Sequence, residues 1–153
     1  QIDFYSPKKF DLHFTNANGE KEHPVIIHRA IMGSFDRFFA FLIEKHAGAF
    51  PLWLCPIQVK VLSVGESHKE FCCQLADIFK AKDIRVTIDQ SAETVGKKIR
   101  KAVNEKLPYM LVIGDKEMNS KDLSVRDRGS NEMREININD LIQEIKDKVE
   151  KKS

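Results

Sequence analysis

Cysteine is scarce in this chain of 153 residues, and long hydrophobic runs and low-complexity segments are absent from its sequence. The three cysteines, Cys55, Cys72 and Cys73, are an odd number without a Cys-x-x-Cys spacing, which favours buried thiols in a reducing compartment over a disulfide framework. The longest apolar runs are far shorter than a membrane-spanning helix, and no signal peptide precedes them. We therefore expect a soluble protein of the cytoplasmic type.

Net charge is also small, because 25 Lys and Arg stand against 23 Asp and Glu, a balance of +2. The overall field is too weak to hold a polyanion, so any contact with nucleic acid must come from a local basic patch. Hydrophobic residues make up 42% and charged residues 31%, which indicates a globular fold and excludes disorder. Because the chain opens at Gln1, inside an alternating pattern, we expect it to be a piece of a larger protein.

Residues 1–48 predict two or three strands followed by one helix, too little to bury an independent core. Asn18-Gly19 supplies a turn between two strands, and the second, "PVIIHRAI", is so continuously apolar that we expect it to be buried on both faces. Ser34 is suited to cap a helix that ends before Gly48. One apolar stripe runs along that helix: Phe35, Phe38, Phe39, Leu42 and Ile43.

A connector bracketed by prolines, "AFPLWLCP", marks the best domain boundary, and residues 49–153 then alternate between strand and helix patterns. We expect a helix whose cap begins at Ser91, a hairpin formed by "LSVRDRG" and "MREINI", and a final helix over 139–153. The alternation predicts an α/β domain of three layers, with a mixed, largely parallel five-stranded sheet flanked by helices.

The stretch "HRAIMGSFDRF", from His28 to Phe38, resembles motif 3 of the class II aminoacyl-tRNA synthetases, a strand–turn–helix that carries an arginine on ATP. It is most similar to the threonyl-tRNA synthetases, whose version reads like "HRAIxGSxERF". The resemblance continues through "GAFPLWLCPIQV", "GKKIR", "LPYMLVIGDKE" and "SVRDR" and covers essentially the whole chain. It implies that residues 1–48 end a class II antiparallel-sheet catalytic domain and that residues 49–153 are an anticodon-binding domain.

The resemblance also implies a function, the ATP-dependent charging of tRNA(Thr) by a threonine–tRNA ligase. The parent enzyme would use ATP, Mg²⁺ and Zn²⁺ and act as a homodimer, whereas we expect the 153-residue chain alone not to form the adenylate. The alternatives are a prolyl or glycyl enzyme of the same class and a non-catalytic tRNA-binding module of the same fold. The chain departs from the family pattern at Asp36, usually glutamate, and at Ala92 and Thr94, where many members have Asn and Lys.

Arg37 is a poor choice for helix stability, because a cation in the first turn faces the positive helix end, at a cost of roughly 0.3–1 kcal/mol. Its planar guanidinium can stack on adenine and reach phosphate oxygens, and the resemblance implies that it packs on ATP. A solvated surface arginine is the alternative. Ser34 is most simply the helix cap and could also line the substrate pocket. Gln1 matches a polar pocket residue, although a frayed terminus is the simpler reading.

His28, by its residue type and position alone, is most simply a hydrogen-bonded core histidine, since a zinc site needs three protein ligands and no neighbouring spacing completes one. The resemblance implies that it is the third zinc ligand of the parent enzyme. Such a metal would bind the hydroxyl of threonine, because an apolar pocket alone distinguishes threonine from valine by only about a hundredfold.

Basic residues crowd one helix of the second part, at Lys97, Lys98, Arg100 and Lys101. Such a run is most often a solvated face, but an anticodon loop is read by base-edge hydrogen bonds and phosphate pairing. The resemblance implies that Arg100, Glu117 and Arg126 contact anticodon bases. A carboxylate suits amino and imino donors of a base, and arginine suits carbonyl oxygens and ring nitrogens.

Overall fold

The computed structural model describes residues 1–152 and divides the chain into two compact units, Gln1–Phe41 and Leu42–Ser153. In the part of the chain so described, no helix is long and apolar enough to cross a membrane.

The first unit contains short elements joined by turns. A hairpin forms as expected around the Asn18-Gly19 turn, where β2 (Phe14–Thr15) pairs antiparallel with β3 (Lys21–Glu22) and Gly19 adopts a φ of +81°. The other elements of this unit are β1 (Ile2–Asp3), the helical turn α1 (Ser6–Lys9) and β4 (Ile26–Ile27).

The expectation for "PVIIHRAI" is wrong in one respect. Its strand part, β4, is only Ile26–Ile27 and pairs antiparallel with β1 at the start of the chain instead of forming the second arm of the hairpin. Ile27 is 67% exposed and Ile31 92% exposed, so this strand is not buried on both faces. The reason is that β1 is its one partner strand within the described residues, and its faces therefore stay open to solvent.

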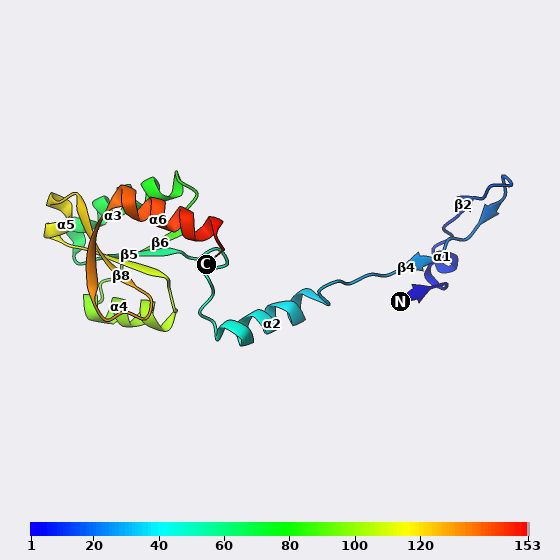
Figure 1. Cartoon of the computed structure of the whole chain (residues 1–153), viewed down its shortest axis with the longest axis horizontal. Helices are drawn as coiled ribbons and strands as arrows, with labels where there is room; N and C mark the ends of the chain where they lie inside the picture. Colours follow the sequence, from blue (N-terminus) through cyan, green and yellow to red (C-terminus); the bar gives the residue numbers. More distant parts are fainter. Residues whose placement is uncertain (153) are drawn as a thin grey trace. The chain divides into compact units, whose positions relative to one another are not determined.

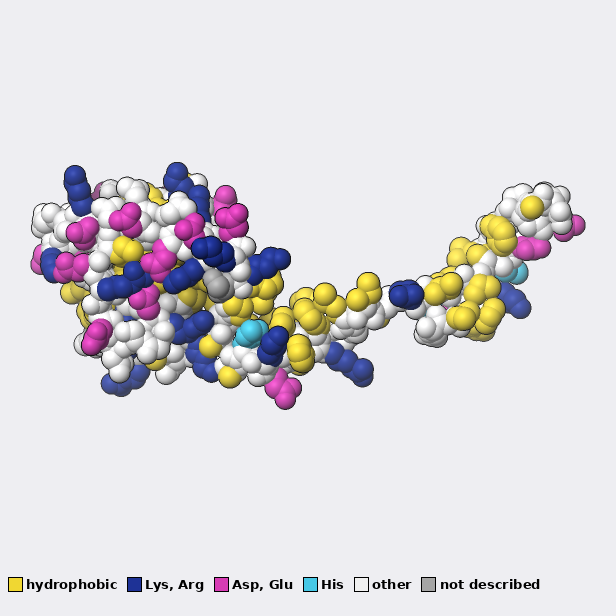
Figure 2. Space-filling view, viewed as in Figure 1, with side chains coloured by type: hydrophobic (Ala, Val, Ile, Leu, Met, Phe, Trp, Pro, Cys, Tyr) yellow, Lys and Arg dark blue, Asp and Glu magenta, His cyan; other side chains and the backbone are white. Residues whose placement is uncertain are grey.

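The helix after the turn, α2 (Phe35–His46), begins and ends where the sequence indicates. The Arg37 backbone N–H donates to the Ser34 hydroxyl (3.3 Å), and Gly48 closes the helix with a φ of +75° and an N–H bond to the Ile43 carbonyl (3.1 Å). The apolar stripe is present but mostly exposed, with Phe35 at 81% and with Phe38 and Leu42 partly buried. Figure 2 shows these hydrophobic side chains open to solvent along α2.

The second unit is built on a mixed sheet of five strands in the order β6-β5-β7-β8-β9. The first three strands in that order are parallel to one another, and β8 and β9 continue antiparallel as the expected hairpin. This confirms the predicted α/β fold with a mixed five-stranded sheet. The strands are β5 (Val59–Ser63), β6 (Val86–Asp89), β7 (Tyr109–Ile113), β8 (Asp122–Asp127) and β9 (Met133–Asn137).

Helices cover the sheet on both sides, and Figure 1 shows α3 and α6 on one side and α4 on the other. The main core lies under α3 and α6, with Val59, Phe79 and Leu111 fully buried, and a smaller cluster of Ala102, Leu107 and Met110 lies under α4. The helices are α3 (Lys69–Lys80), α4 (Val95–Asn104), α5 (Asp115–Asn119) and α6 (Ile138–Glu150), with a 3₁₀ turn at Glu66–His68.

Helix α4 begins later than the sequence suggested. Its N-cap residue is Thr94, and Ser91 instead directs its hydroxyl to the Asp89 carboxylate (2.7 Å). Ser91 therefore stabilises the turn after β6, and the helix starts one turn later.

Candidate nucleic-acid interface

The polar face of strand β8 lies on the α4 side of the sheet. Side chains alternate along a strand, and Leu123 and Val125 enter the main core, so Ser124 and Arg126 point to the opposite face. That face borders a cavity of about 200 Å³ between the end of α4 and the β8–β9 turn. Its lining includes Val103, Lys106, Met110, Arg126, Arg128 and Asn131.

Arg126 is oriented by the turn that follows its strand. Its Nε donates to the Ser130 carbonyl (2.8 Å), and its Nη2 donates to the Asn131 side-chain oxygen (2.9 Å). A guanidinium carries five N–H donors, so these two bonds leave further donors for an acceptor in the cavity. The result is a half-buried arginine held in a fixed direction.

Glu117 is the third residue of α5 and is only 7% exposed. Its Oε2 accepts the Gly114 N–H (3.0 Å), and its Oε1 accepts the Ser124 hydroxyl. Burial opposes ionisation of Glu117, but the hydrogen bonds from Ser124 and Gly114 outweigh it and lower the pKa of the carboxyl from its ordinary value. The group is a charged acceptor with lone pairs to spare, and Ser124 connects it to the strand that carries Arg126.

The basic side chains of α4 lie in different environments: some are paired with a carboxylate, one is exposed and one is buried. Lys97 and Lys101 both pair with Glu93 (2.9 and 2.6 Å), and their hydrogen bonds hold the pKa of Glu93 below its ordinary value. Arg100 is exposed and makes no ion pair with the residues that the structure describes. Arg100 is therefore the cation of this helix that is free to meet a phosphate or a base.

The expectation that the whole basic run faces solvent or RNA is wrong for Lys98. This side chain is buried, with only 2% exposed. Its Nζ donates to the Ser63 carbonyl (2.7 Å) and contacts the Ser63 hydroxyl (3.2 Å) and the Asp89 carbonyl (3.4 Å). The helical spacing could have predicted this burial, because Lys98 lies four residues before the buried Ala102 and so shares its helix face.

Gln1 and His28 are brought together in the first unit by the pairing of β1 with β4. The His28 N–H donates to the Gln1 carbonyl (2.9 Å), and the His28 Nε2 lies 3.2 Å from the Asp3 carboxylate. Hydrogen bonds from Ser6 and then from His28 hold the pKa of Asp3 well below its ordinary value. The His28 side chain is 52% exposed, which differs from a buried core histidine. His28 and Asp3 together offer one imidazole and one carboxylate, whereas a zinc site needs three protein ligands.

Arg37 and Ser34 lie together at the start of α2, where Ser34 is the cap already described. The Arg37 side chain is exposed in the first helical turn, and the rings of Phe35 and Phe39 stack on each other on a different face of the helix (centroids 6.1 Å apart). An exposed guanidinium can stack on a planar ring and donate to phosphate oxygens.

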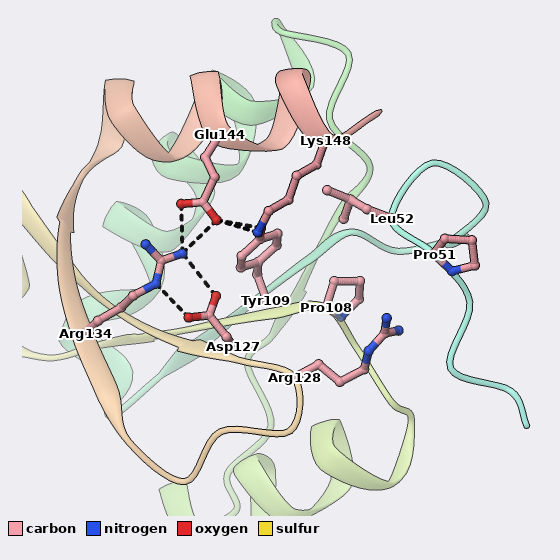
Figure 3. A pocket seen from close by; sticks show the side chains of 9 residues that line it. All are labelled: Pro51, Leu52, Pro108, Tyr109, Asp127, Arg128, Arg134, Glu144 and Lys148. Atoms are coloured by element: carbon pink, nitrogen blue, oxygen red, sulfur yellow. Dashed lines mark hydrogen bonds and ion pairs between the residues drawn. The ribbon is translucent and has the colours of Figure 1, made fainter. Parts of the chain in front are cut away.

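A second polar cluster, which the sequence did not indicate, lines a pocket of about 390 Å³ in the second unit (Figure 3). Arg134 on β9 donates to both Asp127 on β8 and Glu144 on α6. Tyr109 and Lys148 complete the cluster by donating to the same Glu144 carboxylate (2.9 and 2.8 Å). The cations here are matched by carboxylates, which indicates a structural network.

Comparisons with known proteins agree with the resemblance in the sequence. Residues 58–148 match the profile of a family described as the anticodon binding domain. Threonine–tRNA ligases from Clostridium novyi (strain NT) and Desulforamulus reducens are each 43% identical over 153 residues, covering 100% of this chain and 24% of those proteins. The chain thus spans about a quarter of the length of these relatives.

Solved structures show the same fold. The RNA binding domain of threonyl-tRNA synthetase from Cryptosporidium parvum superposes with a TM-score of 0.71 at 34% identity, covering 96% of this chain and 37% of that chain. Prolyl-tRNA synthetase from the same organism has a TM-score of 0.65 at 21% identity, covering 95% and 32%, and supports the fold alone.

Proposed function

Because the chain belongs to the family of anticodon-binding domains, we propose that its second unit binds the anticodon loop of a tRNA as part of a threonine–tRNA ligase. The observation that carries the proposal is the polar face of β8, where Ser124 links Glu117 to the strand of Arg126 beside a cavity. The identity of 43% to threonine–tRNA ligases favours threonine as the amino acid and tRNA(Thr) as the partner.

In this proposal Glu117, Arg126 and Arg100 each contact a different group of the RNA. Glu117 accepts a hydrogen bond from an amino or imino group of a base, and Arg126 donates to a base carbonyl or ring nitrogen. Arg100 on α4 meets a phosphate or a second base. Ala92 and Thr94 are exposed before and at the start of α4, so the contacts made with RNA at these two positions would differ from those of longer polar side chains.

The mixed surface charge supports recognition by these few contacts instead of a broad basic field. In Figure 2 basic and acidic side chains are intermixed over the visible face of the second unit, and the net charge is +2. Binding should therefore depend on the base sequence more than on the length of the RNA.

The test is binding of the 153-residue chain to a tRNA(Thr) transcript and to the same transcript with a changed anticodon. Arg100→Ala and Arg126→Ala should each weaken binding of the first by about 1–3 kcal/mol, the usual worth of a base contact. Lys80→Ala is the matched control, because Lys80 is an exposed cation on α3, across the sheet. The proposal fails if both transcripts bind equally, or if Lys80→Ala weakens binding as much as the arginine variants.

We further propose that the first unit contributes to the active site of the longer enzyme. Arg37 would pack on ATP, Ser34 and Gln1 would line the substrate pocket, and His28 would be one zinc ligand. The residues described around His28 do not complete a zinc site, so the remaining ligands and the Mg²⁺ site belong to other parts of such an enzyme. Adenylate formation by this chain alone is not expected, and a cytoplasmic homodimer is the proposed state of the longer enzyme.

A further inference from the structure

Two histidines face each other at the open end of the β2–β3 hairpin. Phe14 pairs with Glu22 in this antiparallel ladder, so the next positions outward are His13 and His23. Their ring centroids are 4.4 Å apart, and the planes are tilted by 32°. Such a cross-strand pair holds two imidazoles together without any helix or core around them.

Hydrogen bonds to the backbone orient both rings. The Nδ1 of His13 lies 3.0 Å from the Asp11 carbonyl, and the Nδ1 of His23 lies 2.9 Å from the Leu12 carbonyl. A carbonyl oxygen can only accept, so each Nδ1 carries the proton in these bonds, and each neutral ring leaves the lone pair on Nε2. This is how histidines that bind metals are commonly held, with the second nitrogen donating to a carbonyl or carboxylate.

A carboxylate completes the group. The Asp11 Oδ1 lies 3.6 Å from the His13 Nε2, on the side of the ring that the backbone bond leaves free. One ligating atom each from Asp11, His13 and His23 lies within 4.8 Å of the other two. Zinc holds nitrogen and oxygen ligands at about 2.0–2.2 Å, so small side-chain rotations bring three such atoms onto one ion.

We propose that Asp11, His13 and His23 form a surface site for a divalent transition-metal ion such as Zn²⁺. Two imidazoles and one carboxylate suit such ions better than Mg²⁺ or Ca²⁺, which prefer oxygen ligands. The fourth position is open to water. This site is separate from His28, which the proposed function assigns to a different zinc, and it does not depend on tRNA binding.

The ion would join the two ends of the hairpin. Asp11 and His13 precede β2, and His23 follows β3, so one metal closes the segment between them into a loop. The binding free energy then adds to the stability of this segment.

The experiment titrates the 153-residue chain with Zn²⁺ by calorimetry and with Co²⁺ by visible absorption. We expect one ion per chain, with histidine NMR signals of His13 and His23 shifting together. His13→Ala, His23→Ala and Asp11→Asn should each weaken binding at least about tenfold, since even indirect supports of a metal cost 10–100-fold. Far-UV circular dichroism should be unchanged, because all three side chains are exposed.

Controls separate this site from other ligands. His46→Ala should bind Zn²⁺ as the unchanged chain does, and the Co²⁺ spectrum should lack the intense bands of thiolate ligation by the exposed Cys73. The inference is overturned if the chain shows no saturable binding, if His28→Ala abolishes it, or if the three ligand variants bind normally.

Discussion

Lys98 places a positive charge against the carboxyl ends of two parallel strands. Its Nζ donates to the carbonyl of Ser63 at the end of β5 and contacts the carbonyl of Asp89 at the end of β6. At Asp89, burial opposes ionisation, but hydrogen bonds from Ser91 and the charge of Lys98 keep the pKa of the carboxyl below its ordinary value. One lysine thus joins α4 to the ends of the sheet.

Replacing Lys98 tests this role. Lys98→Ala should lower the free energy of unfolding by about 2–4 kcal/mol, because it removes the lysine donor from the Ser63 carbonyl and opens a cavity. Lys97→Ala is the matched control on the same helix, where loss of an exposed ion pair with Glu93 should cost under about 1 kcal/mol. Urea denaturation measures both.

Lys98→Met separates packing from hydrogen bonding, since it refills most of the volume without a donor. It should remain clearly less stable than the unchanged chain. Equal stability of the Lys97→Ala and Lys98→Ala variants would show that the buried amine does not anchor the strands.

Helix α6 is joined to three strands by the network around Glu144 (Figure 3). Tyr109 on β7 and Arg134 on β9 both donate to its carboxylate, and Arg134 also holds Asp127 on β8. Burial opposes ionisation of Glu144, but hydrogen bonds from Lys148, Tyr109 and Arg134 outweigh it and lower its pKa. The carboxylate is therefore more stable in the folded chain than in the unfolded one.

The stability that Glu144 contributes should depend on pH. Because the folded-state pKa of Glu144 lies below the ordinary value of 4.5, its contribution is complete above that pH and is lost as the pH falls through the folded-state pKa. Glu144→Gln should lower the free energy of unfolding by about 1–3 kcal/mol at pH 7 and flatten the decline in stability below about pH 4.5.

Urea denaturation at a series of pH values measures this effect. Glu150→Gln, at the exposed end of the same helix, should keep the profile of the unchanged chain. If Glu144→Gln leaves both the stability at pH 7 and the slope in acid unchanged, the network does not stabilise α6.

At the scale of the whole molecule, the buried hydrophobic residues belong to the second unit. Those that the structure describes begin at Leu52 and end at Ile145. The first unit has short strands and the exposed beginning of the α2 stripe. Cooperative unfolding should therefore come from Leu42–Ser153.

Removal of residues 1–41 tests this division. The shortened chain should unfold in urea with the same midpoint as the whole chain, and its m-value should agree to within about 10–15%, because m follows the surface that unfolding exposes. It should also keep the discrimination between the two tRNA transcripts. A broad transition, or loss of tRNA discrimination, would show that the first unit is required for the fold or for binding.

The hydrophobic pattern of the sequence was enough to predict the order of strands and helices in the second unit. A repeat of two residues indicates a strand buried on one face, and a repeat of 3.6 residues indicates a helix buried on one face. The same reasoning failed for "PVIIHRAI" and placed the cap of α4 at Ser91 instead of Thr94. An apolar run predicts a strand but not its partners, and a serine predicts a local hydrogen bond but not which acceptor or donor is nearest.

The sequence by itself determined the fold class, the helix cap at Ser34 and, through the motif at His28 to Phe38, the family to which the chain is similar. These features depend on residues near one another along the chain. The tertiary structure alone decided that Lys98 is buried, that Ser124 links Glu117 to the strand of Arg126, and that His13 meets His23 across a hairpin. Those contacts join residues from separate elements, and only the register and packing of the elements fix which side chains meet.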